Sequence, residues 1–207
     1  MIELIDNALQ FGVFLACGVY CGARLIRSRS DYWFLLTCAY GSYLLGLAYW
    51  LLHLIFYRET PEYFYVSELS WLASYLFLIL LLRSDMTKAE QSYRSPLLLG
   101  IPAVCIALCL FFFRWGEYLV NVLWGALMCV LGLTALRGLL YARKQKGAED
   151  RKALCIASLV LFCVEYALWV VSCFWQGNAL DPYFFLDVCL TASLAAFAFA
   201  GRKEAEG

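Results

Sequence analysis

The chain has 207 residues, of which 64% are hydrophobic and 15% are charged, and its mean hydropathy is +0.73. Soluble domains carry roughly 25% charged residues, so this composition excludes an ordinary soluble domain and predicts a polytopic membrane protein. The net charge is zero, so the chain shows no sign of a nucleic-acid-binding surface.

Seven apolar segments follow one another along the chain, and each is close to the ~20 residues that a helix needs to cross the hydrocarbon core. These segments cover about 4–26, 32–57, 62–82, 96–113, 117–141, 152–175 and 181–200. The polar breaks between them are too short to hold a soluble domain. The sequence therefore predicts a single all-α domain over residues 1–207, built as a bundle of seven transmembrane helices in the lipid bilayer.

The basic residues of the breaks alternate along the chain. The first, third and fifth breaks and the tail carry most of them: Arg24, Arg27, Arg29, Arg83, Lys88, Arg94, Arg143, Lys144, Lys146, Arg151, Lys152, Arg202 and Lys203. By the positive-inside rule, the N-terminus is expected outside and the C-terminus in the cytoplasm. No signal peptide is expected, since the opening "MIELIDNALQ" is acidic where such a peptide is basic. We expect a multi-pass protein of the plasma membrane, the inner membrane in a bacterium.

An internal repeat is indicated when the chain is aligned with itself at an offset of 119 residues. Charged and aromatic positions then match through two loops: Arg24 with Arg143, Asp31 with Asp150, Trp50 with Trp169, Glu62 with Asp181, and Glu68 with Asp187. The match predicts two parallel three-helix units, about 4–82 and 117–200, joined by a connector helix at about 96–113. Sites in membrane proteins with such repeats lie near the interface between the units.

This 3+1+3 plan resembles the seven-helix membrane superfamily that includes SWEET/PQ-loop transporters and microbial rhodopsins. The last span adds a local similarity to the rhodopsin branch, because Leu186-Asp187-Val188 matches a motif that is followed three residues later by the retinal-binding lysine. That position holds Thr191 here, so a Schiff base to retinal cannot form. The resemblance implies a seven-helix architecture with the N-terminus outside, and it implies no cofactor.

Four ionisable residues lie inside the apolar segments: His53, Glu68, Glu165 and Asp187. A charge at the bilayer centre costs about 2.5–3.5 kcal/mol on insertion scales, so such residues usually face the bundle interior. In the expected orientation, all four fall in the outer half of the membrane. Arg137, by contrast, lies near the cytoplasmic end of its span and can extend to the interface.

We therefore predict an outward-facing polar pocket between the two repeat units that binds a small molecule or a cation. Its expected residues are Glu68, Asp187, Glu165, His53, Thr191, Trp71 and Trp169. Carboxylates this close must share protons or bind a cation. The sequence leaves open whether the pocket takes a metal ion. It also leaves open a purely structural role, in which the acids hydrogen-bond across helices, His53 lies at the interface and the tryptophans only pack.

No enzyme signature occurs, because the single histidine excludes multi-histidine metal motifs and no nucleophile or phosphate-binding motif is present. An intramembrane hydrolase acting through carboxylates alone is the minor alternative. The ten cysteines all fall in apolar segments and are expected to be packing residues. The leading hypothesis is a transporter or permease. The alternative is a membrane receptor that signals through a cytoplasmic protein partner, for which the basic fifth break would be a docking site. The oligomeric state is left open.

Overall fold

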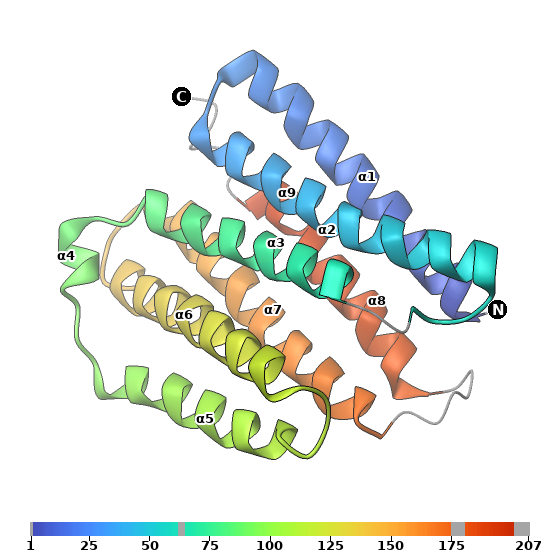
Figure 1. The fold of residues 1–207 in the computed structure, drawn as a ribbon. Helices are drawn as coiled ribbons and strands as arrows, with labels where there is room; N and C mark the ends of the chain where they lie inside the picture. The colour runs from blue at the N-terminus through green and yellow to red at the C-terminus, as the bar shows by residue number, and fades with distance from the viewer. Residues whose placement is uncertain (1, 62–64, 175–180, 201–207) are drawn as a thin grey trace.

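The computed structural model describes residues 2–61, 65–174 and 181–200, which form helices and no strands. The elements are α1 (Ile2–Ser28), α2 (Asp31–Tyr57), α3 (Tyr65–Ser84), α4 (Lys88–Gln91), η1 (Pro96–Leu99), α5 (Gly100–Phe112), α6 (Tyr118–Ala142), α7 (Glu149–Ser172), α8 (Pro182–Ala195) and α9 (Phe197–Ala200) (Figure 1). The expected features at Glu62, Arg202 and Lys203 lie outside these residues.

Six of the described helices are long and apolar enough to cross a membrane: α1, α2, α3, α6, α7 and the stretch Pro182–Ala200 that α8 and α9 share. The connector expected at 96–113 forms a shorter apolar helix, Pro96–Phe112. The prediction of an all-α, multi-pass membrane bundle is thus confirmed. The seventh span, the repeat and the orientation remain predictions.

Local sequence explains where several helices begin and end. At the start of α8, the Asp181 side chain accepts a hydrogen bond from the backbone N–H of Tyr183 at 3.0 Å, and Pro182 occupies the first helical position, where its missing N–H costs nothing. Helix α2 ends where Arg58 adopts a left-handed conformation and its N–H bonds to the carbonyl of Leu54. These caps satisfy backbone groups that the first and last turns of a helix leave without partners.

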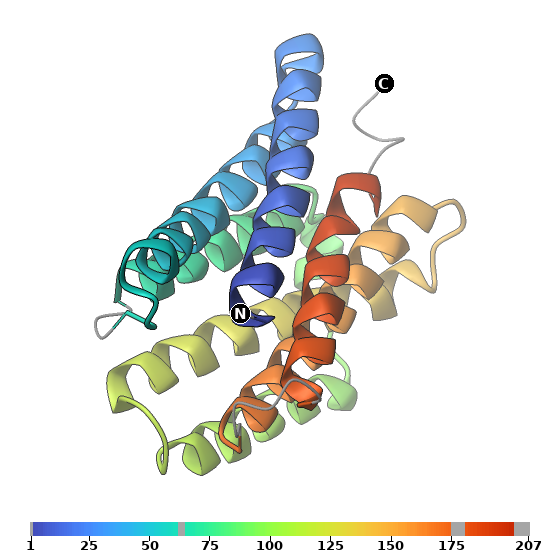
Figure 2. The ribbon, with the colours of Figure 1, turned by 90° about the vertical axis from the view of Figure 1, so that its right-hand side faces the viewer.

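The long helices form two groups of three. Helix α2 packs against α1 and α3 in the first group, and α7 packs against α6 and α8 in the second. Two further contacts join the groups, between α1 and α8, which Figure 2 shows side by side, and between α3 and α6. Helix α5 packs mainly on α6 at the edge of the bundle (Figure 1).

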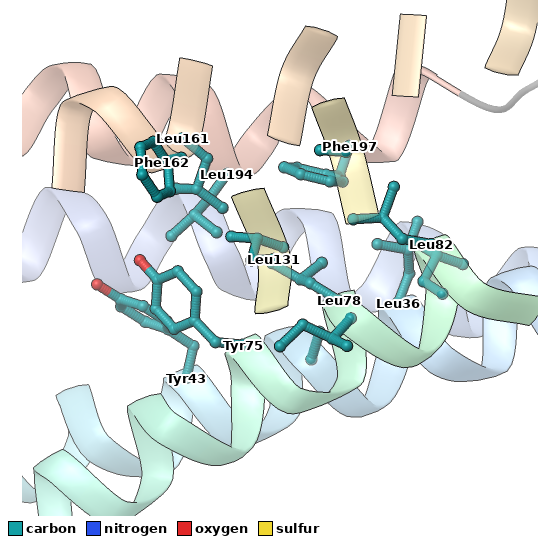
Figure 3. Packing of buried hydrophobic residues seen from close by; sticks show 14 of the residues in the cluster. Leu36, Tyr43, Tyr75, Leu78, Leu82, Leu131, Leu161, Phe162, Leu194 and Phe197 are labelled. Carbon is teal, nitrogen blue, oxygen red and sulfur yellow. The ribbon is translucent and has the colours of Figure 1, made fainter. Parts of the chain in front are cut away.

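Large aliphatic and aromatic side chains fill the middle of the bundle (Figure 3). Buried side chains of this kind come from every long helix: Phe14, Leu36, Leu78, Leu82, Leu131, Leu161, Leu194 and Phe197. The carboxylates of the spans lie at one end of this packed region and the basic loops lie at the other.

A buried ion pair closes the basic end of the bundle. Glu90 on α4 is 2% exposed, and it accepts a hydrogen bond from Arg151 on α7, which is 8% exposed, at 2.5 Å. Gly138 on α6 makes room, since a Cβ there would lie 2.7 Å from Glu90 Oε1 and 2.6 Å from Cys155 Sγ. The sequence had placed Arg151 among the loop charges. Helix α7 instead begins at Glu149, so Arg151 faces inward and its charge is paired.

Candidate functional site

A cavity of about 270 Å³ opens at the end of the bundle where α1, α3, α6 and α8 begin and where α2 and α7 end. Side chains from all six helices line it, so it lies between the two three-helix groups. Among the described residues of its lining, four are carboxylates: Glu3, Glu68, Glu165 and Asp187. Four are tryptophans: Trp50, Trp71, Trp124 and Trp169. Of the described residues that line the cavity, none is lysine, arginine or histidine.

Glu165 and Glu68 are held in different ways. Glu165 on α7 is 5% exposed, and its Oε2 accepts a hydrogen bond from the Tyr75 hydroxyl at 2.7 Å. Tyr75 comes from α3, so this bond ties the first group of helices to the second. Glu68 on α3 is half-buried, and its Oε2 is buried without a hydrogen-bond partner among the described residues. A buried carboxylate oxygen without a partner is costly, so Glu68 has capacity left for a donor or a cation.

Asp187 on α8 belongs to a hydrogen-bonded network with α1. Its Oδ1 accepts from the Gln10 amide at 3.1 Å, and the same amide donates to Thr191 Oγ1 at 3.0 Å. The Thr191 hydroxyl in turn donates to the backbone carbonyl of Asp187 at 3.0 Å. Asp6 on α1 lies close enough to interact with the Asp187 carboxyl. Two carboxylates this close repel each other, so this corner of the cavity favours a proton or another positive charge.

The tryptophan rings form two clusters, one from α2 and α3 and the other from α6 and α7. Trp50 and Trp71 lie 6.0 Å apart between ring centroids, and Trp124 and Trp169 lie 5.3 Å apart. Gly46 on α2 permits the first cluster, because a Cβ there would lie 2.7 Å from Trp71 Nε1. That indole nitrogen is buried without a partner among the described residues. The Trp71 ring therefore packs with its nitrogen edge against α2 at Gly46.

The structure brings together five of the seven residues expected at the pocket: Glu68, Glu165, Asp187, Trp71 and Trp169. Thr191 lies behind Asp187 and does not line the cavity. His53 lies apart, because its Nδ1 is 3.0 Å from the carbonyl oxygen of Glu59 and its ring packs against Tyr57 at 4.7 Å. The histidine belongs to the end of α2 rather than to the cavity.

The sequence analysis did not identify the contribution of α1. Glu3, Asn7 and Gln10 all line the cavity, and their spacing of four and three residues places them on one face of a helix. This polar face within an apolar span could have been recognised in the sequence as part of a polar site. Trp124 and Tyr43 also line the cavity, and their positions in uniformly apolar segments carried no comparable signal.

The lining supports recognition of positive charge. Carboxylates attract it, and tryptophan faces add cation–π attraction, which is strongest in a desolvated site. In the described part of the chain, no three histidine, cysteine or acidic side chains lie close enough together to hold one metal ion. Comparison of the chain with protein-family models, curated proteins and solved structures finds no match.

Proposed function

We propose that this protein is a permease-like membrane protein that takes a small organic cation into the cavity between its two helix groups. The observation that carries the proposal is the lining: four carboxylates, four tryptophans and, among the described residues, no basic side chain. Such a site favours a cation over a neutral compound of the same shape, because only the cation compensates the buried negative charge.

The size of the cavity supports a compact ligand. Pockets for drug-sized molecules measure about 300–1,000 Å³, and this one is about 270 Å³. An ammonium group with a few carbons fits that volume. The unpaired Glu68 Oε2 would accept a hydrogen bond from the ammonium group of such a ligand, while the tryptophan faces cover its apolar part.

Two features support the proposed repeat. Two residue pairs that match at the offset of 119, Glu68 with Asp187 and Trp50 with Trp169, line the same cavity. The contacts between the groups also agree with the repeat. At the offset of 119 residues, α1 corresponds to α6 and α3 corresponds to α8. A two-fold axis along the membrane normal would therefore exchange the α1–α8 pair with the α6–α3 pair, and both pairs are in contact. The cavity then lies on the pseudo-two-fold axis.

The proposed orientation places this cavity on the outer side. Arg27, Arg83, Lys88 and Arg143 lie at the far end of the bundle from the cavity. The positive-inside rule assigns that end to the cytoplasm.

A receptor is the second candidate, and the packed layer beneath the cavity is the observation that favours it. Tyr75, Leu78 and Leu131 are each at most 2% exposed and stand between the cavity and the basic end (Figure 3). A transporter must open this layer in another conformation, whereas a receptor need only shift the helices that carry it.

Binding is tested with the purified protein in phosphatidylcholine nanodiscs, with tetramethylammonium as the probe and tert-butanol as a neutral compound of the same shape. We expect tetramethylammonium to bind and tert-butanol not to bind. Charged hydrogen bonds and contacts contribute about 1.5–3 kcal/mol, so Glu165→Gln and Asp187→Asn should each weaken binding about 10- to 100-fold. Glu149→Gln, at an exposed position on the same helix as Glu165, is the control and should bind normally.

Transport is then tested by uptake of radiolabelled tetramethylammonium into liposomes that contain the protein. Uptake above that of empty liposomes, lost in Glu165→Gln, supports the permease. Binding without uptake supports the receptor. Equal binding of the two probes, or full binding by both cavity variants, would refute the cation site itself.

A further inference from the structure

A second cavity lies at the opposite end of the bundle, between α6 and the start of the η1–α5 segment. It measures about 460 Å³ and is open to the exterior. Two arginines line it, Arg94 just before η1 and Arg137 on α6, together with Ser95. The lining contains no acidic residue among those that the structure describes. This cavity is therefore opposite in charge to the acidic cavity.

Both arginines lack an anionic partner within the described part of the chain. Arg94 is exposed, while Arg137 is half-buried and its Nε is buried without a hydrogen-bond partner. Arg137 lies five residues before the end of α6, which is ~7.5 Å along the helix axis at 1.5 Å per residue. Arg151 on the neighbouring α7 differs, because Glu90 neutralises it. An anion bound in the cavity would neutralise the charge of Arg137, as Glu90 neutralises that of Arg151.

The rest of the wall is apolar and continues onto the outer surface of the bundle. Leu98 and Leu133 line the cavity, as does Leu99, which is 73% exposed. Next to it, Leu97 is 64% exposed. In a membrane, these leucines face acyl chains. A ligand at this place can therefore set a phosphate against the arginines and a hydrocarbon chain against the leucines.

We propose that this cavity binds the headgroup of an anionic phospholipid, with its phosphate between Arg94 and Arg137. The guanidinium fork matches phosphate in geometry and forms paired, charge-assisted hydrogen bonds with it. Basic pockets between transmembrane helices are known to bind anionic lipid headgroups on the cytoplasmic side. The site is independent of the acidic cavity, and it also anchors α5, which packs mainly on α6.

The test is native mass spectrometry of the protein released from nanodiscs that contain equal amounts of phosphatidylglycerol and phosphatidylcholine. We expect the wild-type protein to retain phosphatidylglycerol in preference to phosphatidylcholine. Arg94→Gln and Arg137→Gln should each reduce that retention about tenfold, which corresponds to the loss of one charge-assisted contact. Arg137→Lys keeps the charge without the planar fork and should fall between Arg137→Gln and the wild type.

Arg143→Gln is the matched control, because Arg143 is an exposed basic residue just beyond the same end of α6 and does not line the cavity. It should change retention less than twofold. Equal retention of the two lipids by the wild type, or equal loss in all the arginine variants, would overturn the site in favour of general surface attraction. Displacement of the lipid by millimolar glycerol phosphate, with no effect of acyl chains, would assign the site to a soluble phosphate instead and overturn the lipid proposal. Circular dichroism of every variant ensures that lost retention is not lost folding.

Discussion

Replacing Glu90 by glutamine should strongly destabilise the protein, because it leaves the charge of Arg151 buried without a counter-charge. Removing one partner of a buried ion pair typically costs about 3–5 kcal/mol. The side chains here are 3% and 9% exposed, so solvent does little to screen the pair. Arg151 Nε and Nη1 are already buried without hydrogen-bond partners among the described residues, so the lost hydrogen bond adds to two that Arg151 already lacks.

Asp85 limits the size of this effect. Burial raises the pKa of the Asp85 carboxyl, and the nearby charge of Arg151 lowers it by a smaller amount. Asp85 is therefore close enough to replace part of the lost counter-charge, and we expect the cost to lie near ~3 kcal/mol, the lower end of the range for broken buried pairs. At 2–4 °C per kcal/mol for chains of this size, the melting temperature should fall by about 6–12 °C.

The assay is thermal unfolding of Glu90→Gln in detergent, followed by a double-mutant cycle with Glu90→Leu, Arg151→Met and both together. Since an apolar pair replaces a buried ion pair at little cost, the double variant should unfold within ~1 kcal/mol of the wild type. Lys152→Ala breaks the exposed pair with Glu149 on the same helix and should cost less than ~0.5 kcal/mol. A single Glu90 variant that unfolds like the wild type, or a double variant no better than the worse single one, would refute the reasoning.

Two further substitutions test how the acidic cavity is built. Gly46→Ala should displace Trp71, since the added Cβ would lie 2.7 Å from its indole nitrogen. The affinity for tetramethylammonium in nanodiscs should then fall about tenfold, while the melting temperature changes less than in Glu90→Gln. Unchanged affinity would contradict the role assigned to Trp71. Tyr75→Phe keeps the ring but removes the 2.7 Å hydrogen bond to Glu165. The free energy of unfolding, measured by thermal unfolding, should therefore fall by about 1.5–3 kcal/mol. A change below ~0.5 kcal/mol would show that this bond does not hold the helix groups together.

Much of the fold could be read along the chain because it depends on local properties. Each span was recognisable from its own length and apolarity, and the boundaries agree within a few residues, as where α2 ends at Tyr57. The placement of Glu68, Glu165 and Asp187 in one cavity also followed, because a carboxylate inside an apolar helix must face the interior. The prediction that His53 lines the cavity was wrong. Only two turns of helix separate the cavity from the interface at the end of α2, and a position along the sequence does not distinguish the two places.

What the sequence by itself determined is the class of the protein: a bundle of apolar helices with acids at one end and basic loops at the other. Hydrophobicity and charge act on each segment separately, so no knowledge of neighbouring helices was needed. The tertiary structure alone decided which side chains meet. Gln10 reaches Asp187 across 177 positions, Tyr75 reaches Glu165 across 90, and Glu90 leaves a polar loop to pair with Arg151. Such pairings depend on how the helices rotate about their axes and pack, which no single segment encodes.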